Sequence, residues 1–171
     1  MSNRQINMND ITRVEQLVYT PLEKKYLHVQ QTNVVIIYLI LMGIGLFWLL
    51  ALDSSTRLWG CLLTEAGLLM ALLTNLWILP KAYNFKGFAI REHDITYRSG
   101  ILFPSVITIP FCKIQQVSIS QNPVSRYFGL YSVDLVNGAQ LESAAHIPGL
   151  PEDRANEIKA LVIERVRHEN N

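Results

Sequence analysis

Hydrophobic residues are unevenly distributed along the chain. Two long apolar runs, residues 32–52 and 58–80, are followed from Lys81 onward by short segments in which apolar and polar positions alternate. About twenty apolar residues are needed to cross the hydrocarbon of a bilayer as a helix. The polar residues 53–57 between the runs favour a turn. The pattern therefore predicts two antiparallel transmembrane helices joined by a very short loop.

Basic residues flank this pair of runs on one side. Lys24 and Lys25 precede the first run, Lys81 and Lys86 follow the second, and the connecting loop contains only Arg57. Because cytoplasmic flanks are enriched in Lys and Arg, both termini are expected in the cytoplasm. Amphipathic rings near the ends of the runs support the boundaries; these are Trp48, Trp59, Trp77 and Tyr83.

The segment before the first run contains a helix-start signal. Thr20, Pro21 and Glu23 occupy the N-cap, first and third helical positions of a capping box. We therefore expect a helix to begin at Thr20 and to continue into the membrane.

The second run contains small residues at intervals of three and four, which place them on one helix face. This small-residue face consists of Gly60, Thr64, Gly67, Ala71 and Thr74. It is expected to pack against the first helix of the same chain, and the alternative is a contact with another subunit. Glu65 lies off this face and is interpreted as a second contact surface, since an acid inside the membrane is costly without a role. The alternative is that Glu65 has no such role, because it lies near the outer edge of the span, where water could reach it.

The part of the chain after Lys81 has the features of an all-β sandwich or barrel, with β-branched and aromatic residues between frequent turn signals. A hairpin turn is expected at Asn137-Gly138. The predicted strands are residues 88–92, 95–98, 106–109, 114–120, 130–136 and 139–144.

The end of the chain changes to a helical period. Pro151 suits a first helical position, and Glu152 and Asp153 suit the positive first turn. An amphipathic C-terminal helix is predicted, with an apolar side that covers the sandwich. That side consists of Ala155, Ile158, Leu161, Val162 and Val166.

Short motifs in the β-rich part resemble those of the bacterial membrane-flanked pleckstrin-homology-like (PH-like) domain, and the two preceding helices resemble its short YdbS-like members. The motifs are Arg98 with Gly100, Ile109-Pro110, Lys113-Ile114-Gln115, Gln121, Pro123, Phe128-Gly129-Leu130 and Ile147-Pro148-Gly149-Leu150. The resemblance extends from about Pro21 to Val166 and implies a seven-stranded sheet closed by a C-terminal helix. Because only six strands are predicted directly, a seventh is expected near residues 99–106.

The apolar runs, the basic flanks and the resemblance together predict a domain organisation and a location. Residues 1–31 are expected to form a cytoplasmic segment, residues 32–80 the membrane hairpin, and residues 81–171 a cytoplasmic PH-like domain. The protein is expected in the bacterial inner (plasma) membrane as a multi-pass protein. Since short members of the family often accompany a larger one, the expected partner is a larger membrane protein with PH-like domains.

The candidate interaction residues are Glu65, Gly67, Arg98, Lys113 and Gln115. Lys113 and Gln115 are expected on one strand face, where they could meet a protein partner or lipid headgroups. The alternative function is the sensing of anionic phospholipid. Phosphoinositide-binding PH domains, however, use closely spaced basic residues, and Lys86, Arg91 and Arg98 are separated in this sequence.

Other functional classes have little support. The net charge of +1 and the scattered basic residues do not favour nucleic-acid binding. No nucleophile elbow, metalloprotease motif or phosphate loop is present, so no enzyme activity is expected. Cys61 and Cys112 have no second cysteine at metal-ligand spacing, and no metal or cofactor is expected. The sequence is best interpreted as a membrane-anchored PH-like interaction module.

Overall fold

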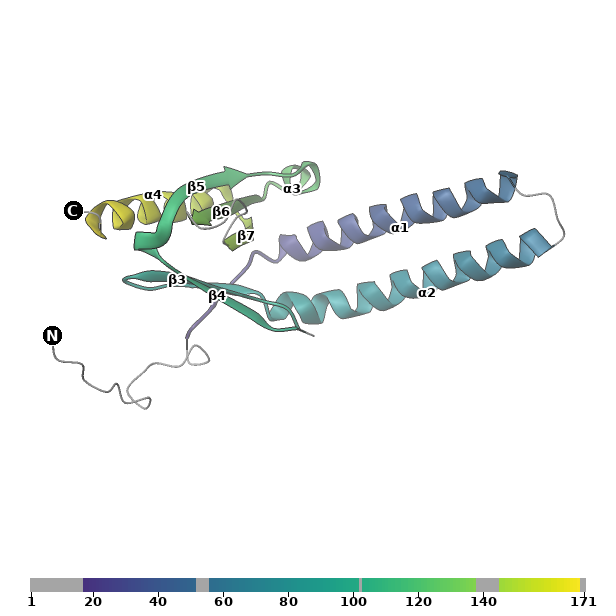
Figure 1. Ribbon diagram of the computed structural model, residues 1–171, viewed down its shortest axis with the longest axis horizontal. Helices are drawn as coiled ribbons and strands as arrows, with labels where there is room; N and C mark the ends of the chain where they lie inside the picture. The colour runs from purple at the N-terminus through teal and green to yellow at the C-terminus, as the bar shows by residue number, and fades with distance from the viewer. Residues whose placement is uncertain (1–16, 52–55, 102, 138–144, 170–171) are drawn as a thin grey trace.

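Two long helices project as a hairpin from a small β-rich domain in the computed structural model, which describes residues 17–51, 56–101, 103–137 and 145–169 (Figure 1). The helices are α1 (Lys25–Ala51) and α2 (Thr56–Asn84). Both are long and apolar enough to cross a membrane, and only 6% of each apolar window is buried. The two apolar helices expected from the sequence are therefore confirmed, and α2 continues through Pro80.

The face of α2 that contacts α1 differs from the predicted one. Between Leu58 and Trp77 the half-buried positions of α2 recur every three or four residues, and they are Cys61, Glu65, Leu68, Leu72 and Leu76. All five residues of the small-residue face are exposed, so the prediction that this face packs against α1 is wrong. The physical reason is that larger side chains, mostly leucines, fill the space between the helices and leave the small residues outside the contact.

The helix start predicted at Thr20 is also wrong. Thr20–Pro21 is a short strand, β1, which pairs antiparallel with β2 (Gly87–Ile90), and α1 begins only at Lys25. A proline is tolerated on an edge strand because its missing N–H faces away from the sheet. Leu22, directly after β1, is buried in the core of the β-rich domain. Sheet pairing and the burial of Leu22 thus outweigh the local capping signal.

The strands form two antiparallel sheets. The first has the order β1-β2-β3-β4 and the second the order β5-β6-β7. The remaining elements are β3 (Asp94–Ser99), β4 (Ser105–Pro110), η3 (Phe111–Lys113), β5 (Ile114–Ser120), α3 (Pro123–Tyr127), β6 (Tyr131–Asn137) and β7 (Ala145–Leu150). With the C-terminal helix described below, this arrangement confirms the predicted PH-like sandwich.

Two strand predictions need comment. The extra strand expected near residues 99–106 is wrong, because β3 ends at Ser99, a turn follows, and β4 begins at Ser105. Two of the observed strands have no directly predicted counterpart: β1, which comes before the hairpin, and β7. The predicted strand 139–144 and Gly138 of the predicted turn lie outside the described residues, and β7 follows them.

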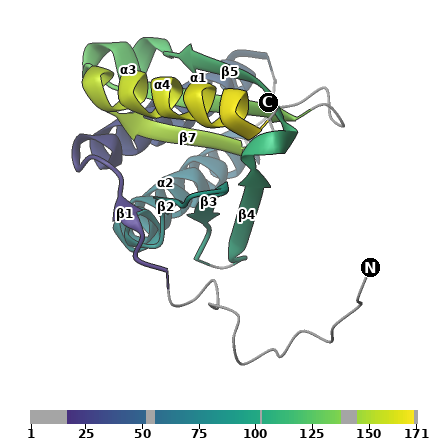
Figure 2. The same cartoon turned by 90° about the vertical axis from the view of Figure 1, so that its left-hand side faces the viewer.

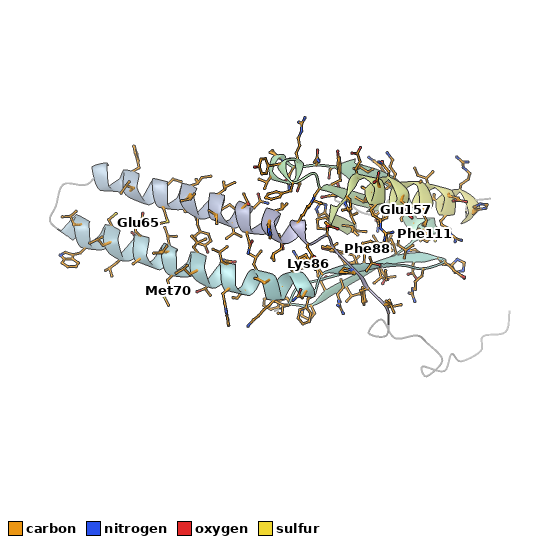
Figure 3. All side chains as sticks on the ribbon, turned by 180° about the vertical axis from the view of Figure 1, so that it is seen from behind. Glu65, Met70, Lys86, Phe88, Phe111 and Glu157 are labelled. Atoms are coloured by element: carbon orange, nitrogen blue, oxygen red, sulfur yellow. The ribbon has the colours of Figure 1, made fainter. Side chains whose placement is uncertain are left out.

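The core lies between the two sheets and is closed by α4 (Glu152–Glu169). Phe111 of η3 is 0% exposed and lies in the β-rich domain (Figure 3). Figure 2 shows α4 lying along the three-stranded sheet, and α4 contacts β5, β6 and η3. Its residues Ala155, Ile158 and Val162 are buried, so the predicted apolar side of the C-terminal helix is confirmed.

Candidate interaction surfaces

The five candidate residues do not form one site. Glu65 and Gly67 lie on α2, Arg98 lies on β3 close to the base of the hairpin, and Lys113 and Gln115 lie where β5 begins. The start of β5 is at the end of the domain away from the hairpin (Figure 1). The structure therefore separates the candidates into a hairpin pair, a junction residue and a membrane-distal pair.

Glu65 lies off the small-residue face, in the contact between the two helices. A Cβ atom added to Gly45 of α1 would be 2.5 Å from Glu65 Oε1, which shows that the missing side chain of Gly45 makes room for the carboxyl group. Among the described residues, this oxygen is buried and has no hydrogen-bond partner. A buried polar atom without a hydrogen-bond partner is costly, so the Glu65 carboxyl group is a position where an external partner would be favourable.

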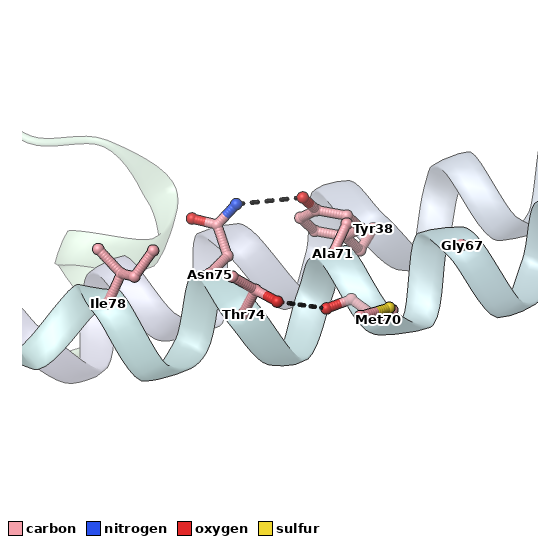
Figure 4. A pocket seen from close by; sticks show the side chains of 7 residues that line it. All are labelled: Tyr38, Gly67, Met70, Ala71, Thr74, Asn75 and Ile78. Atoms are coloured by element: carbon pink, nitrogen blue, oxygen red, sulfur yellow. Dashed lines mark hydrogen bonds between the residues drawn. The ribbon is translucent and has the colours of Figure 1, made fainter.

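Gly67 lines a groove of 570 Å³ on one flank of the hairpin (Figure 4). A Cβ atom added to Gly67 would meet no atom within 4 Å. Asn75 Nδ2 donates to the hydroxyl group of Tyr38 across the helices at 3.1 Å, and this polar pair lies in the groove. The groove is lined by Tyr38, Gly67, Met70, Ala71, Thr74, Asn75 and Ile78.

Thr74 does not offer a free hydroxyl proton to this groove. Its Oγ1 donates to the carbonyl oxygen of Met70 at 2.8 Å (Figure 4). Thr64, further along the same face, likewise bonds to backbone oxygens within its own helix. The groove therefore presents small and apolar surface, with the Tyr38–Asn75 pair as its polar feature.

Several contacts join the hairpin to the PH-like domain. The backbone N–H of Glu23 donates to the carbonyl oxygen of Gly149 at 3.2 Å, and the Tyr83 hydroxyl group donates to the carbonyl oxygen of Leu22 at 2.6 Å. The ring of Tyr26 packs directly against Gly149. Lys86 Nζ lies 5.5 Å from the centre of the same ring, and burial lowers the pKa of Lys86.

The family motifs at α3 form a second part of this junction. Asn122 caps α3 by accepting a hydrogen bond from the N–H of Ser125 at 2.6 Å. Gln121 Nε2 donates to the carbonyl oxygen of Leu130 at 3.1 Å, which closes the α3 loop. The Phe128 ring meets the His28 ring of α1 edge-on, with centroids 6.5 Å apart. The sequence located these motifs, but it gave no signal that they contact α1.

The basic residues considered for lipid recognition point to separate partners. Arg98 lies over the Tyr19 ring at 4.3 Å, whereas Arg91 pairs with Asp94 at 2.8 Å. The hydrogen bonds to Asp94 raise the pKa of Arg91. Lys86 faces a tyrosine ring, as described above. These three side chains do not converge on one phosphate-sized position, in agreement with their spacing in the sequence.

The expected shared strand face of Lys113 and Gln115 is wrong. Lys113 ends the short helix η3, whereas Gln115 lies on β5, next to an irregularity in its pairing with β6. Both side chains are exposed. Because they lie at the membrane-distal end, they face away from the bilayer in which the hairpin would lie.

Comparison with known proteins agrees with this architecture. A family described as bacterial PH domain matches residues 26–166, and the chain belongs to this family. The chain is also 26% identical over 92 residues to the UPF0699 transmembrane protein YdbS of Bacillus subtilis (strain 168). That alignment covers 53% of this chain and 56% of YdbS, so the chain spans little more than half of its relative. No solved structure gives a significant match.

Proposed function

We propose that the protein is a membrane-anchored PH-like interaction module, a non-catalytic subunit that docks on a larger membrane protein with PH-like domains. In this proposal α1 and α2 cross the bacterial inner membrane with both termini in the cytoplasm. The positions of Lys24, Lys25, Lys81 and Lys86 near the domain support this orientation.

The observation that carries the proposal is the groove beside Gly67. The small-residue face of α2 is not used to hold α1, because another face of α2 makes that contact. Small residues allow two helix backbones to approach closely in a membrane, where packing drives association. The occupant we propose is a transmembrane helix of the partner, which would pack its own backbone against Gly67 and Ala71.

The test compares two glycines of the hairpin that have the same free space for an added side chain. Gly67 lies in the groove, whereas Gly43 lies on α1, and a Cβ atom added to either one meets nothing within 4 Å. Each is replaced by isoleucine in a full-length chain with a C-terminal tag. The proteins are extracted from native membranes in mild detergent, and co-purifying proteins are quantified by mass spectrometry.

We expect a membrane protein with PH-like domains to co-purify in fixed ratio with the unmodified chain and with Gly43→Ile, and to be lost with Gly67→Ile. Loss with both variants, or with neither, contradicts the groove as the docking surface. A chain that purifies alone with enriched anionic lipid contradicts the docking proposal as a whole and favours the lipid-sensing alternative.

Glu65 is tested in the same assay. Glu65→Gln preserves the shape of the side chain and removes its capacity for charge. If the partner supplies a group that pairs with the ionised carboxylate, co-purification should fall. Unchanged co-purification and unchanged stability would remove Glu65 from the candidate residues.

A further inference from the structure

The two most exposed aromatic side chains of the PH-like domain lie on two separate turns. Phe103 is 88% exposed in the β3–β4 turn, and Tyr127 is 87% exposed at the end of α3. Among the large apolar side chains described between residues 85 and 168, the next most exposed are Phe85 and Ile163, both at 46%. A single exposed apolar residue is ordinary on a protein surface. Two highly exposed aromatic rings on separate turns at one end of a domain instead suggest a shared contact surface.

Both turns lie at the end of the domain that faces the hairpin. Figure 1 shows α3 beside the first turns of α1, and the β3–β4 turn beside the last turns of α2. Contacts support this view, because Phe128 meets His28 of α1, and Arg98 Nε donates to the carbonyl oxygen of Phe85, just after α2. The two tips therefore flank the hairpin where it meets the domain.

The contacts near both tips lie at the polar ends of the two hairpin helices, at His28 before the apolar run of α1 and at Phe85 after α2. On α2 the exposed Trp77 ring lies 3.8 Å from Lys81 Nζ, a pair typical of a membrane interface. The segment of α1 next to α3 is polar and includes His28 and Gln31. Both tips thus lie next to the boundary between apolar and polar hairpin surface, where aromatic rings favour the headgroup zone.

We propose that Phe103 and Tyr127 insert into the headgroup zone of the cytoplasmic leaflet and hold the PH-like domain on the bilayer at two points beside the hairpin. The ligand is the lipid surface itself, contacted by aromatic rings and not by a headgroup pocket. The exposed Arg126 next to Tyr127 adds attraction to anionic lipid. The inference rests on the proposed insertion of α1 and α2, but not on the proposed protein partner.

A close backbone approach in one turn and a ring contact in the other support the proposal. Gly100 has a φ of +82°, and a Cβ atom there would overlap the carbonyl oxygen of Phe103, so only glycine fits this tight turn. The Tyr127 ring meets the Phe128 ring edge-on, with centroids 5.3 Å apart, and Phe128 in turn contacts α1. The Tyr127 tip is therefore linked to α1 through Phe128, and Gly100 fits closely against the backbone of Phe103.

The experiment uses tryptophan as a conservative probe. Trp48, Trp59 and Trp77 are replaced by phenylalanine in the full-length chain, and Phe103→Trp, Tyr127→Trp or the control Glu92→Trp is introduced. Glu92 is exposed in the β2–β3 turn, at the membrane-distal end. The proteins are reconstituted into bilayers of phosphatidylcholine and phosphatidylglycerol, with lipids spin-labelled either near the headgroup or deep in the acyl chain.

We expect the emission of the Phe103→Trp and Tyr127→Trp variants to be blue-shifted and quenched most strongly by the shallow spin label, with the Glu92→Trp variant unaffected. Emission from both tips that equals the Glu92→Trp control overturns the proposal. A blue shift that appears only when a partner protein is added, without lipid quenching, also overturns it and assigns the tips to a protein contact.

A second measurement separates this proposal from the docking proposal. The double variant Phe103→Ala, Tyr127→Ala should retain its co-purifying partner, because the groove on α2 is intact, while the domain becomes more accessible to protease at the bilayer surface. Failure of the tip contact and failure of the groove are then observed in different assays. Unchanged protease accessibility in the double variant would contradict a holding role for the two rings.

Discussion

Gly149 provides a sharp test of how the PH-like domain is fixed to the hairpin. Its φ is +69°, and a Cβ atom there would lie 2.5 Å from Tyr26 Cγ and 2.6 Å from Tyr26 Cβ. Gly149→Ala would therefore add backbone strain of about 1–2 kcal/mol. It would also add overpacking against α1 of about 1–3 kcal/mol. We expect a total loss of about 2–5 kcal/mol in the free energy of unfolding.

Gly129→Ala is the matched control. Gly129 has nearly the same φ, +66°, but an added Cβ atom meets nothing within 4 Å. The Gly129→Ala variant should therefore lose only the free energy of unfolding that corresponds to backbone strain, about 1–2 kcal/mol. Thermal unfolding of the full-length chain in mild detergent, followed by the near-ultraviolet circular dichroism of the tyrosines, measures both. Since 1 kcal/mol shifts the Tm of a domain of this size by about 4–8 °C, the difference between the variants should be readily measured.

A double-mutant cycle then assigns the difference to Tyr26. In a Tyr26→Gly background, Gly149→Ala should cost no more than Gly129→Ala, because both the Cβ atom and the ring that a new methyl group would strike are absent. Equal Tm values for Gly149→Ala and Gly129→Ala in the unmodified background would refute this reasoning. They would mean that α1 moves away from β7 at negligible cost.

Three further substitutions test the domain itself. Phe111→Ala removes a side chain that is 0% exposed and should cost about 3–5 kcal/mol, measured by the same thermal unfolding; a loss below about 1 kcal/mol would contradict its place in the core. Asn122→Ala removes the cap of α3 and should cost about 0.5–2 kcal/mol, with faster hydrogen exchange at the Ser125 amide; unchanged exchange would count against the cap. Burial raises the pKa of Tyr97 above its ordinary value of 10.0, so the unfolded chain loses this proton first and stability falls as the pH rises above about 10. The Tyr97→Phe variant should lack the contribution of Tyr97 to this loss of stability, which is at most about 1.4 kcal/mol per pH unit. Identical curves of stability against pH for the two proteins would contradict the prediction.

The long apolar runs and the helical end of the chain could be predicted because each signal is local. A run of about twenty apolar residues identifies a membrane helix without reference to the rest of the fold. The apolar side of α4 was equally clear, and Ala155, Ile158 and Val162 are buried as expected. The PH-like fold followed from the resemblance to a family, which adds information that periodicity does not contain.

The predictions that were wrong depend on contacts between distant segments. The capping signal at Thr20 is real in the sequence, but its competitor is a strand that begins at Gly87. The face of α2 that meets α1 depends on which side chains of two helices fill a shared space, and small residues suit either an intramolecular contact or an external groove. The close fit of Glu65 to Gly45 likewise needs the pairing of the two helices.

The position of β1 makes the PH-like domain discontinuous in the chain. Its edge strand is synthesised before the hairpin, and the strand it pairs with is synthesised after it. Should one helix of the pair fail to insert, Thr20 and Phe88 would remain on opposite sides of the bilayer, and the first sheet would lack its edge strand. A fragment that begins at Lys81 would be incomplete for the same reason, since it omits both β1 and the buried Leu22. If α1 and α2 cross a membrane as proposed, correct topology is thus a precondition for completing the PH-like domain.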